Sequence, residues 1–368
     1  MYLQRKLKNN DNFFRKIKDL DFSLLFCILL LGFISLTTMY STDGGEALFH
    51  TKSHFYKLIV FTFLMLIISF LNIKFWFSVG YLSYLITIAM LIYTINFGIT
   101  ASGSQRWIDL YFLPRFQPIE LVKPFAIILI AIILSSEKNY NIYYKYFISL
   151  MVIVPIIFLL MMQPDIGQTL LIFLSWLTLV FISGISLTIF LTVFTVSIFI
   201  LFYLIFFVDK FGYIKNRVFS FFDPNTGTYN FQSEKAIEAI SSGGFFGKGI
   251  GEGTLKNRVP EAHTDYIVSV ISEEFGIVFI ILLLFIFLFF IYTVFKRIYL
   301  EKDEKVKLIL TGLITLIISQ ALIHLGVNIR LFPTTGMTLP YLSYGGSSII
   351  GMSILSGIIL NLTKRKVV

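Results

Sequence analysis

The chain has 368 residues, of which 57% are hydrophobic and 14% are charged, and its mean hydropathy is +0.83. No soluble core needs that much apolar surface, so the composition predicts a polytopic integral membrane protein. The net charge of +9 comes from short Lys and Arg clusters beside apolar segments. That pattern indicates membrane topology and anionic lipid headgroups, and no nucleic-acid partner. The single cysteine, Cys27, excludes an internal disulfide and a cysteine-based metal site.

Apolar runs of about 20 residues, long enough to span lipid, predict an all-α protein with ten transmembrane helices. Residues 1–21 are expected to form a cytoplasmic tail, and residues 22–368 a single membrane domain. One large loop, 209–265, separates the seventh helix from the eighth, and its glycine-rich and amphipathic pieces predict order against the outer face. The ten segments fall near residues 22–40, 56–72, 75–96, 118–134, 147–163, 168–184, 187–208, 266–295, 306–329 and 341–362.

The distribution of basic residues predicts the orientation of these helices. Lys and Arg gather in the amino-terminal tail, after the fourth helix, between the eighth and ninth helices, and at the carboxyl end. With ten spans, all four places fall on one side of the membrane. The positive-inside rule therefore puts both termini in the cytoplasm and the large loop in the periplasm.

The octapeptide Pro-Glu-Ala-His-Thr-Asp-Tyr-Ile at residues 260–267 ends the large loop and leads directly into the eighth apolar segment. Ionisable groups at the edge of lipid are costly, so they usually serve chemistry or pairing. An unbroken helix over 266–295 would be about 45 Å long, whereas the hydrocarbon core is about 30 Å thick. Its first turns would then project beyond the lipid, with Asp265 above the bilayer beside Glu261 and His263.

Two further expectations follow from this geometry. Glu273 and Glu274 would lie near the outer interface of the membrane. Helix capping by Thr264 or Asp265 is the simpler explanation of the polar residues, but it leaves the neighbouring glutamate and histidine unexplained.

Other polar residues fall on the same predicted outer face. Glu120 and Lys123 are three apart at the start of the fourth helix, so they can form a structural ion pair. Arg106 precedes them, and a second cation on this face would suit a phosphate ligand. Asp165, in the tight turn between the fifth and sixth helices, either caps the sixth helix or belongs to the same site.

The last third of the chain carries a polar stripe and an irregular segment. Gln320, His324 and Asn328 recur every four residues in the ninth helix, which favours helix–helix hydrogen bonding, with cavity lining as the alternative. Residues 333–348 are rich in Gly, Pro and Ser. Such backbone at membrane depth must be buried in protein or line a cavity, because lipid cannot satisfy its amides.

Four motifs together resemble the SEDS family of FtsW and RodA. They read FQPIELVK, QPDIG, PEAHTDY and TLPYLSYGGSS, and begin at residues 116, 163, 260 and 338. Ala262 and the stretch 335–340 resemble division-type FtsW more than elongation-type RodA. His324 and Arg330 depart from the family pattern, which usually has Asn and Gly at these two places.

The resemblance implies a bacterial inner-membrane peptidoglycan glycosyltransferase that polymerises lipid II at the division septum. It also implies that Asp265 is the essential aspartate and that four further residues line the substrate cavity, namely Arg106, Glu120, Lys123 and Asp165. We predict that Glu261, His263, Ser343 and Gly345 complete the substrate site. The implied partners are undecaprenyl-linked glycan, a class B penicillin-binding protein such as FtsI, and other divisome membrane proteins. A divalent cation such as Mg²⁺ is left open.

For this reaction Asp265 is the predicted general base, which removes the proton from the C4 hydroxyl of the acceptor sugar. Joining an α-linked pyrophosphate donor in a β-1,4 bond requires inversion and hence a single displacement. Arg106 and Lys123 are then the candidates to hold the departing pyrophosphate. The alternatives are a lipid II flippase, an elongation-type polymerase like RodA, and a non-catalytic scaffold. A flippase needs a site open to both faces, whereas the ionisable residues here cluster on the outer side.

Overall fold

The computed structural model describes residues 18–43, 48–101, 104–109, 115–136, 141–222 and 228–364, so most of the predicted cytoplasmic tail lies outside the described residues. Within these ranges a helix lies at each of the ten expected apolar segments. These helices are α2 (Phe22–Thr42), α3 (Phe49–Phe70), α4 (Ile73–Phe97), α5 (Pro118–Leu134), α6 (Ile142–Met162), α7 (Ile166–Ile182), α8 (Leu187–Phe207), α11 (Ile267–Leu300), α12 (Glu304–Asn328) and α13 (Gly346–Leu362).

The predicted class of helical membrane protein is confirmed. Of the helices in the described part of the chain, α2, α3, α4, α6, α8, α11 and α12 are long and apolar enough to cross a membrane. Helices α7 and α13 are apolar but shorter. Helix α8 has a mean hydropathy of 2.7 over its most apolar window and buries none of its residues. A helix that is apolar all round and buries none of its residues requires lipid as its solvent.

Local sequence signals explain where several helices begin. Pro118 starts α5, where its missing N–H is no loss. Short polar side chains accept hydrogen bonds from the first-turn N–H groups of α2, α4, α6, α7 and α12, as helix N-termini require. These capping residues are Asp21, Asn72, Asn141, Asp165 and Asp303.

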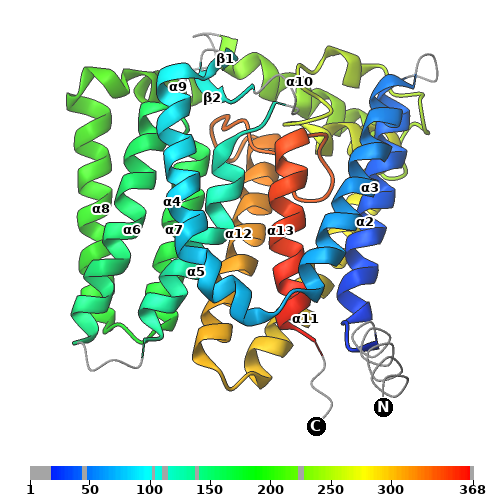
Figure 1. Cartoon of the computed structure of the whole chain (residues 1–368). Helices are drawn as coiled ribbons and strands as arrows, with labels where there is room; N and C mark the ends of the chain where they lie inside the picture. Colours follow the sequence, from blue (N-terminus) through cyan, green and yellow to red (C-terminus); the bar gives the residue numbers. More distant parts are fainter. Residues whose placement is uncertain are drawn as a thin grey trace, which may run out of the picture.

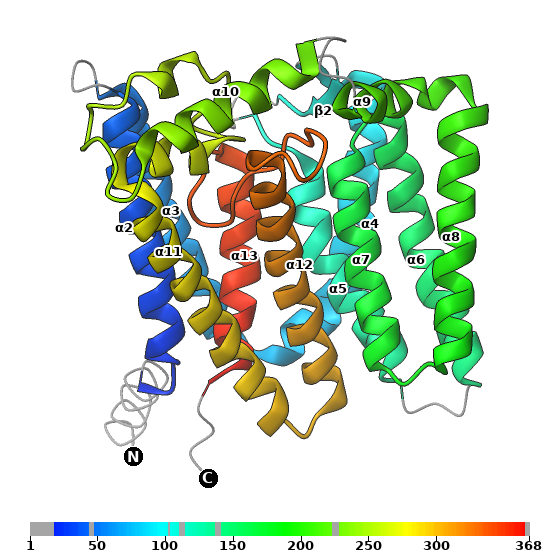
Figure 2. The same cartoon turned by 180° about the vertical axis from the view of Figure 1, so that it is seen from behind.

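The helices form a bundle with α5, α12 and α13 near its centre (Figures 1 and 2). Helix α13 packs along α3, α4 along α5, and α12 along α7. The start of α2 and the end of α13 lie at one end of the bundle, and the large loop covers the opposite end (Figure 1). That covered end carries η1 (Asp209–Phe211), α9 (Gly212–Phe222), α10 (Thr228–Gly243), η2 (Leu255–Arg258), and the ribbon of β1 (Ile99–Ala101) with β2 (Ser104–Trp107).

The expectation of an unbroken eighth helix is wrong, because α11 is interrupted at Gly276, where φ is 76° and ψ is 178°. A turn of the large loop fills the break. The N–H groups of residues 277–278 donate to the carbonyls of residues 244–245 at 3.0 and 3.2 Å. In return, the N–H groups of residues 248–249 donate to the carbonyls of residues 273–274 at 2.9 and 3.0 Å. The turn thus satisfies the backbone groups that the break releases.

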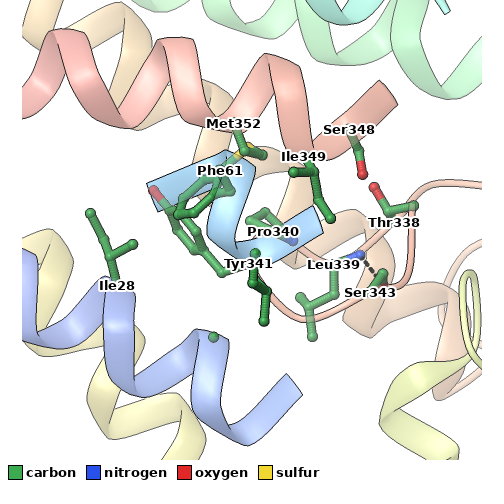
Figure 3. A pocket seen from close by; sticks show the side chains of 12 residues that line it. Ile28, Phe61, Thr338, Leu339, Pro340, Tyr341, Ser343, Ser348, Ile349 and Met352 are labelled. Atoms are coloured by element: carbon green, nitrogen blue, oxygen red, sulfur yellow. Dashed lines mark hydrogen bonds between the residues drawn. The ribbon is translucent and has the colours of Figure 1, made fainter. Parts of the chain in front are cut away.

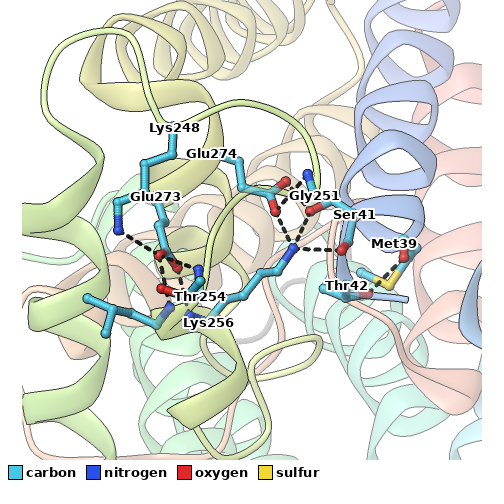
Figure 4. A network of polar contacts seen from close by, with 10 residues as sticks. Met39, Ser41, Thr42, Lys248, Gly251, Thr254, Lys256, Glu273 and Glu274 are labelled. Atoms are coloured by element: carbon cyan, nitrogen blue, oxygen red, sulfur yellow. Dashed lines mark hydrogen bonds and ion pairs between the residues drawn. The ribbon is translucent and has the colours of Figure 1, made fainter. Parts of the chain in front are cut away.

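The two carboxylates beside this break attach the large loop to the bundle (Figure 4). Glu273 accepts hydrogen bonds from the backbone N–H groups of residues 254–256 at 2.6–3.0 Å and from Lys248 Nζ at 3.1 Å. Glu274 pairs with Lys256 and accepts the hydroxyl of Ser41 on α2. Both carboxylates are buried, so these bonds offset the cost of removing their charge from water.

Replacing Gly276 with alanine should destabilise the protein strongly. The new Cβ would collide with the Phe245 carbonyl and the Gly247 nitrogen, in addition to the strain of a positive φ. We expect a loss of about 2–5 kcal/mol in the free energy of unfolding. Gly184→Ala is the matched control, because Gly184 has φ +93° but nothing within 4 Å, so that only about 1–2 kcal/mol of backbone strain applies. Equal thermal stability of the two purified variants would contradict the role of the turn.

Candidate active site

The peptide that carries Asp265 is held by three hydrogen bonds from the carboxyl-terminal third of the chain. The three successive carbonyls of residues 263–265 accept, in order, from Tyr344 N at 2.9 Å, Ser343 Oγ at 2.6 Å and Asn328 Nδ2 at 3.1 Å. Asn328 is the last residue of α12, and the other two donors belong to the irregular segment before α13. The backbone of residues 263–265 is therefore fixed between these two elements.

The capping explanation of this motif is wrong. The N-cap of α11 is Tyr266, and no side chain caps this helix. Thr264 Oγ1 instead donates to a carboxylate oxygen of Glu261 at 3.0 Å. Asp265 lines a cavity, and its Oδ2 lies against Gly336, where φ is +69° and a Cβ would meet that oxygen at 3.4 Å. The carboxylate is thus directed to the cavity and not to the helix start.

The surroundings of Asp265 tune its ionisation. Burial, reinforced by repulsion from Glu261, raises the pKa of Asp265 to about 7, against an opposing attraction from Arg106. A carboxyl group with this pKa is a far better proton acceptor than an ordinary aspartate, because a general base is most effective near the working pH.

The cavity has a volume of about 610 Å³ and lies under the large loop. Five of the residues predicted for the site line it: Arg106, Glu120, Glu261, Asp265 and Gly345. The other four, all within the described residues, do not line it: Lys123, Asp165, His263 and Ser343. The structure therefore gathers the predicted residues in one region but divides them into a lining layer and a supporting layer.

Glu120 and Lys123 form a buried ion pair. Lys123 Nζ lies 2.8 Å from Glu120 Oε2, and each side chain is at most 4% exposed. Gln168 donates to the other carboxylate oxygen at 3.1 Å, and Lys123 also donates to Gln320 at 3.3 Å. Lys123 is consequently occupied by protein groups, and only Glu120 reaches the cavity.

Arg106 and Asp165 form a second pair, at 3.3 Å. Arg106 also donates to the carbonyls of Gln163, at 3.2 Å, and Pro164. Asp165 accepts from the N–H of Gln168 at 3.2 Å and so caps α7, as one interpretation of the sequence held. The guanidinium thus fastens β2 to the turn between α6 and α7.

The polar stripe of α12 mostly binds irregular backbone, and the expected helix–helix hydrogen bond is found at Gln320, which accepts from Lys123 on α5. Gln320 donates to the carbonyl of Thr338 at 2.9 Å, and His324 Nδ1 lies 2.7 Å from the carbonyl of Met337. Asn328 holds the carbonyl of Asp265, as described above. The physical reason is that non-helical backbone inside the bundle must find its partners within the protein.

Two predicted residues support this region instead of facing the cavity. Ser343 Oγ accepts from the N–H of Leu339 at 2.7 Å (Figure 3), besides donating to residue 264. The His263 ring lies 4.9 Å from the ring of His50 and 5.6 Å from that of Tyr344, centroid to centroid. Burial lowers the pKa of His263, which keeps the ring neutral at physiological pH.

Arg330, which replaces a common glycine of the resembled family, keeps the backbone conformation that glycine favours, with φ +55°. Its guanidinium lies 3.4 Å from Glu234 on α10, which ties the end of α12 to the large loop.

Some cavity residues were not predicted from the sequence. Arg217 on α9 and Gln232 on α10 line the cavity from the large loop, and Gln168 and Thr335 line it from the bundle. Among the described residues, Gln168 Oε1 and Thr335 Oγ1 are buried and have no hydrogen-bond partner. The amphipathic pattern of residues 212–222 was the available signal for Arg217, but it does not say which neighbour the helix faces.

The fold and this cavity define a polytopic helical membrane protein with the buried carboxyl group of Asp265 at one end of its bundle. Residues 19–367 match the FtsW/RodA/SpoVE family model, described as "Cell cycle protein", and the chain belongs to that family. It is 33% identical to the probable peptidoglycan glycosyltransferase FtsW of Caulobacter vibrioides, over 82% of this chain and 76% of that one. It is also 33% identical to the protein of that name from Buchnera aphidicola subsp. Baizongia pistaciae, over 92% of each chain.

Solved structures share the fold. The rod shape determining protein RodA of Thermus thermophilus superposes with a TM-score of 0.71 at 24% identity, over 94% of this chain and 96% of that one. A chain from the structure titled "Structural coordination of polymerization and crosslinking by a peptidoglycan synthase complex" gives a TM-score of 0.79 at 23% identity, over 94% and 97%.

The buried ion pair can be tested by comparing a variant that removes one charge with a variant that removes both. Lys123→Met should lower the free energy of unfolding by about 3–5 kcal/mol, because it leaves the Glu120 carboxylate buried without its cation. The double variant Glu120→Gln/Lys123→Met removes both charges and should recover most of that loss in thermal unfolding of the purified protein. If the double variant is as unstable as Lys123→Met, the pair does not act as described.

Proposed function

We propose that the chain polymerises lipid II into glycan strands on the outer side of the bacterial inner membrane, with Asp265 as general base. Its family and its relatives named peptidoglycan glycosyltransferase FtsW make it a peptidoglycan glycosyltransferase of the division type. The catalytic assignment depends on three features of Asp265. Its backbone is fixed by three hydrogen bonds, its carboxylate lines a cavity, and its pKa is raised to about 7.

All ten helices cross the membrane in this proposal, and the end covered by the large loop faces outward. Support comes from the opposite end, where the start of α2 and the end of α13 lie (Figure 1). The junction of α11 and α12 lies there too, and five basic residues lie within it and on the flanking helix ends, as is typical of the cytoplasmic side: Lys296, Arg297, Lys302, Lys305 and Lys307. The three shorter helices, α5, α7 and α13, have 17 residues each, or about 26 Å, which nearly matches a hydrocarbon core of about 30 Å.

The reaction is a single displacement at the anomeric carbon of the donor. The acceptor C4 hydroxyl gives its proton to Asp265 while its oxygen forms the new bond to C1. The bond from C1 to the lipid pyrophosphate breaks on the opposite face, and the electron pair leaves with the pyrophosphate. Arg106, which lowers the pKa of Asp265 by its charge, keeps part of the carboxylate ionised near neutral pH.

Cross-linking of the strands falls to a partner in this proposal, because the sequence carries no transpeptidase signature. We assign that role to a class B penicillin-binding protein of the FtsI type, within the septal assembly of membrane proteins. The similar fold in a peptidoglycan synthase complex supports a partner of this kind.

The lipid II flippase alternative is less well supported by the site. A flippase must present its binding groups to both faces of the membrane in turn. The ionisable residues that line the described cavity all lie at the end covered by the large loop, including Arg106, Glu120 and Asp265.

Asp265→Asn should lower the rate of glycan polymerisation by about 10²–10⁴-fold, the contribution typical of a positioned general base. The amide preserves the shape of the side chain but accepts a proton far less readily. The measurement is the glycan ladder made from labelled lipid II by the purified protein, with and without a class B partner. Glu252→Gln, on an exposed turn of the large loop, is the control. Ladders of wild-type intensity from Asp265→Asn would refute the assignment.

The polymerisation rate should depend on pH with a midpoint near 7. The active form of Asp265 is ionised, and its raised pKa means that the ionised fraction falls as the pH drops below about 7. The rate should therefore rise from pH 5 to pH 8 and then level off. Glu261→Gln removes the repelling charge, so the midpoint should move to lower pH. A midpoint near 4, or one that Glu261→Gln leaves in place, would contradict this account of the base.

A further inference from the structure

Two polar contacts between α2 and α11 lie at opposite ends of these helices. Arg297 pairs with Asp21, the N-cap of α2. At the other end, Glu274 accepts the hydroxyl of Ser41 (Figure 4). The two contacts are 20 residues apart along α2 and 23 apart along α11, or about 30 and 35 Å. The hydrocarbon core of a bilayer is about 30 Å thick, so one contact falls at each membrane interface.

The residues between and beside these contacts support the same placement. Residues 22–40 of α2 and residues 275–295 of α11 contain no Asp, Glu, Lys, Arg or His. Tyr40, which precedes Ser41, and Tyr56 on α3 are exposed, and tyrosine is enriched at membrane interfaces. Both tyrosines line one groove with Ile250 of the large loop. Part of the large loop therefore lies at the level of the interface.

The turn at residues 243–249 is fixed at this level. It fills the break of α11 at Gly276, two residues after Glu274, through the backbone hydrogen bonds described above. Gly243 and Gly247 approach α11 so closely that a Cβ on either would collide with a carbonyl oxygen of that helix. The turn cannot move along α11 without breaking these contacts.

This turn carries two phenylalanines that the protein leaves uncovered. Phe245 is 73% exposed and Phe246 is 83% exposed. Ile277 and Val278, whose N–H groups bond to the turn, are exposed as well, so the apolar surface continues onto the lipid-facing side of α11. Adjacent large apolar side chains are unfavourable in water, and the gain on leaving water grows with their apolar area.

We propose that Phe245 and Phe246 insert into the lipid leaflet at this interface and anchor the large loop to the membrane. The proposal rests on the proposed crossing of the membrane by α2 and α11, but not on its direction or on the reaction. Figure 2 shows α11 inclined across the bundle, and inclination brings the turn closer to the bilayer centre. Lys248 on the same turn, 3.1 Å from Glu273, places a positive charge at the level of the lipid phosphates.

The anchor also fixes the height of the Asp265 cavity. Residues 254–256, which Glu273 binds, and the peptide of residues 263–265 follow the turn along the chain. Because each of these segments is hydrogen-bonded to the bundle, the anchor and the cavity belong to one frame. The cavity is thereby kept near the lipid headgroups, where the sugar and phosphate groups of a lipid-linked substrate lie.

The experiment measures the depth of nitroxide spin labels in the purified full-length protein, reconstituted in phospholipid nanodiscs. Cys27→Ser removes the native thiol, and single labels are attached through Phe245→Cys, Phe246→Cys, Glu252→Cys or Phe285→Cys. Glu252 is the matched control, because it is exposed on the same loop just after the turn. Phe285, which is exposed in the apolar part of α11, provides the reference for lipid. Collisions with oxygen, which concentrates in hydrocarbon, are compared with collisions with a water-soluble nickel chelate.

We expect the labels at positions 245 and 246 to lie about 5–10 Å inside the headgroup boundary, the depth typical of interfacial anchors. Oxygen collisions should exceed nickel collisions there, as at position 285, and the order should be reversed at position 252. Labels at 245 and 246 that resemble the one at 252 would overturn the proposal. Poor access to both reagents would overturn it too, because the turn would then lie in a protein contact, such as one with a second copy of the chain.

A second measurement avoids a label at the turn, since a nitroxide is itself apolar. Phe245→Ser/Phe246→Ser should raise the hydrogen-exchange rates of the amides of residues 248–249 and 277–278 in nanodiscs by at least about tenfold, because the turn loses its apolar burial in lipid. Glu252→Gln should leave these rates unchanged. Wild-type rates in the double serine variant would contradict the anchor.

The label at position 285 separates this proposal from the membrane crossing on which it rests. Nickel access at 285 equal to that at 252 would refute the crossing, and the anchor with it. A label at 285 in lipid, combined with labels at 245 and 246 in water, would refute only the anchor. Neither readout depends on glycan polymerisation, so a failure of the proposed reaction is recognised separately.

Discussion

Backbone that leaves a helix inside an apolar bundle must find all its hydrogen bonds within the protein, and much of this structure follows from that constraint. The segment between α12 and α13 is irregular, and Gln320 and His324 bind its carbonyls. The break in α11 is irregular too, and the turn at residues 243–249 supplies its partners. The turn lies some thirty residues before the break that it fills, so these hydrogen bonds fix the position of the large loop against the bundle.

Asp265 lies between the end of the large loop and the irregular segment before α13. The donors that satisfy its own peptide come from α12 and from the segment before α13, while the large loop covers the cavity that it faces. The carboxylate is therefore immobilised by bonds to its backbone, and its side chain is left to the cavity. Partial removal from water and the nearby Glu261 then give it a pKa suited to proton abstraction at neutral pH. The contacts that hold the backbone of residue 265 in the fold also place its carboxyl group beside Glu261 and the cavity.

The sequence was sufficient to predict the helices and the region of the site, because long apolar runs and motifs can be recognised from neighbouring residues alone. It was insufficient wherever a distant element decides the outcome. Residues 266–295 read as one helix, since the break at Gly276 is stabilised by a turn some thirty residues earlier. Lys123 read as a phosphate ligand because its burial beside Gln320 depends on helix packing. Arg217 was missed because nothing local shows which way α9 faces.

The central claim is that the chamber of Asp265 opens on the outer side of the membrane, and its most direct test is chemical labelling in intact cells. Cys27 is the only cysteine and is buried, so a Cys27→Ser protein provides a background for single new thiols. Glu261→Cys and Lys302→Cys place them at exposed positions at opposite ends of the bundle. A membrane-impermeant maleimide added outside should label position 261 and should label position 302 only after permeabilisation. Labelling of position 302 alone in intact cells would contradict the account.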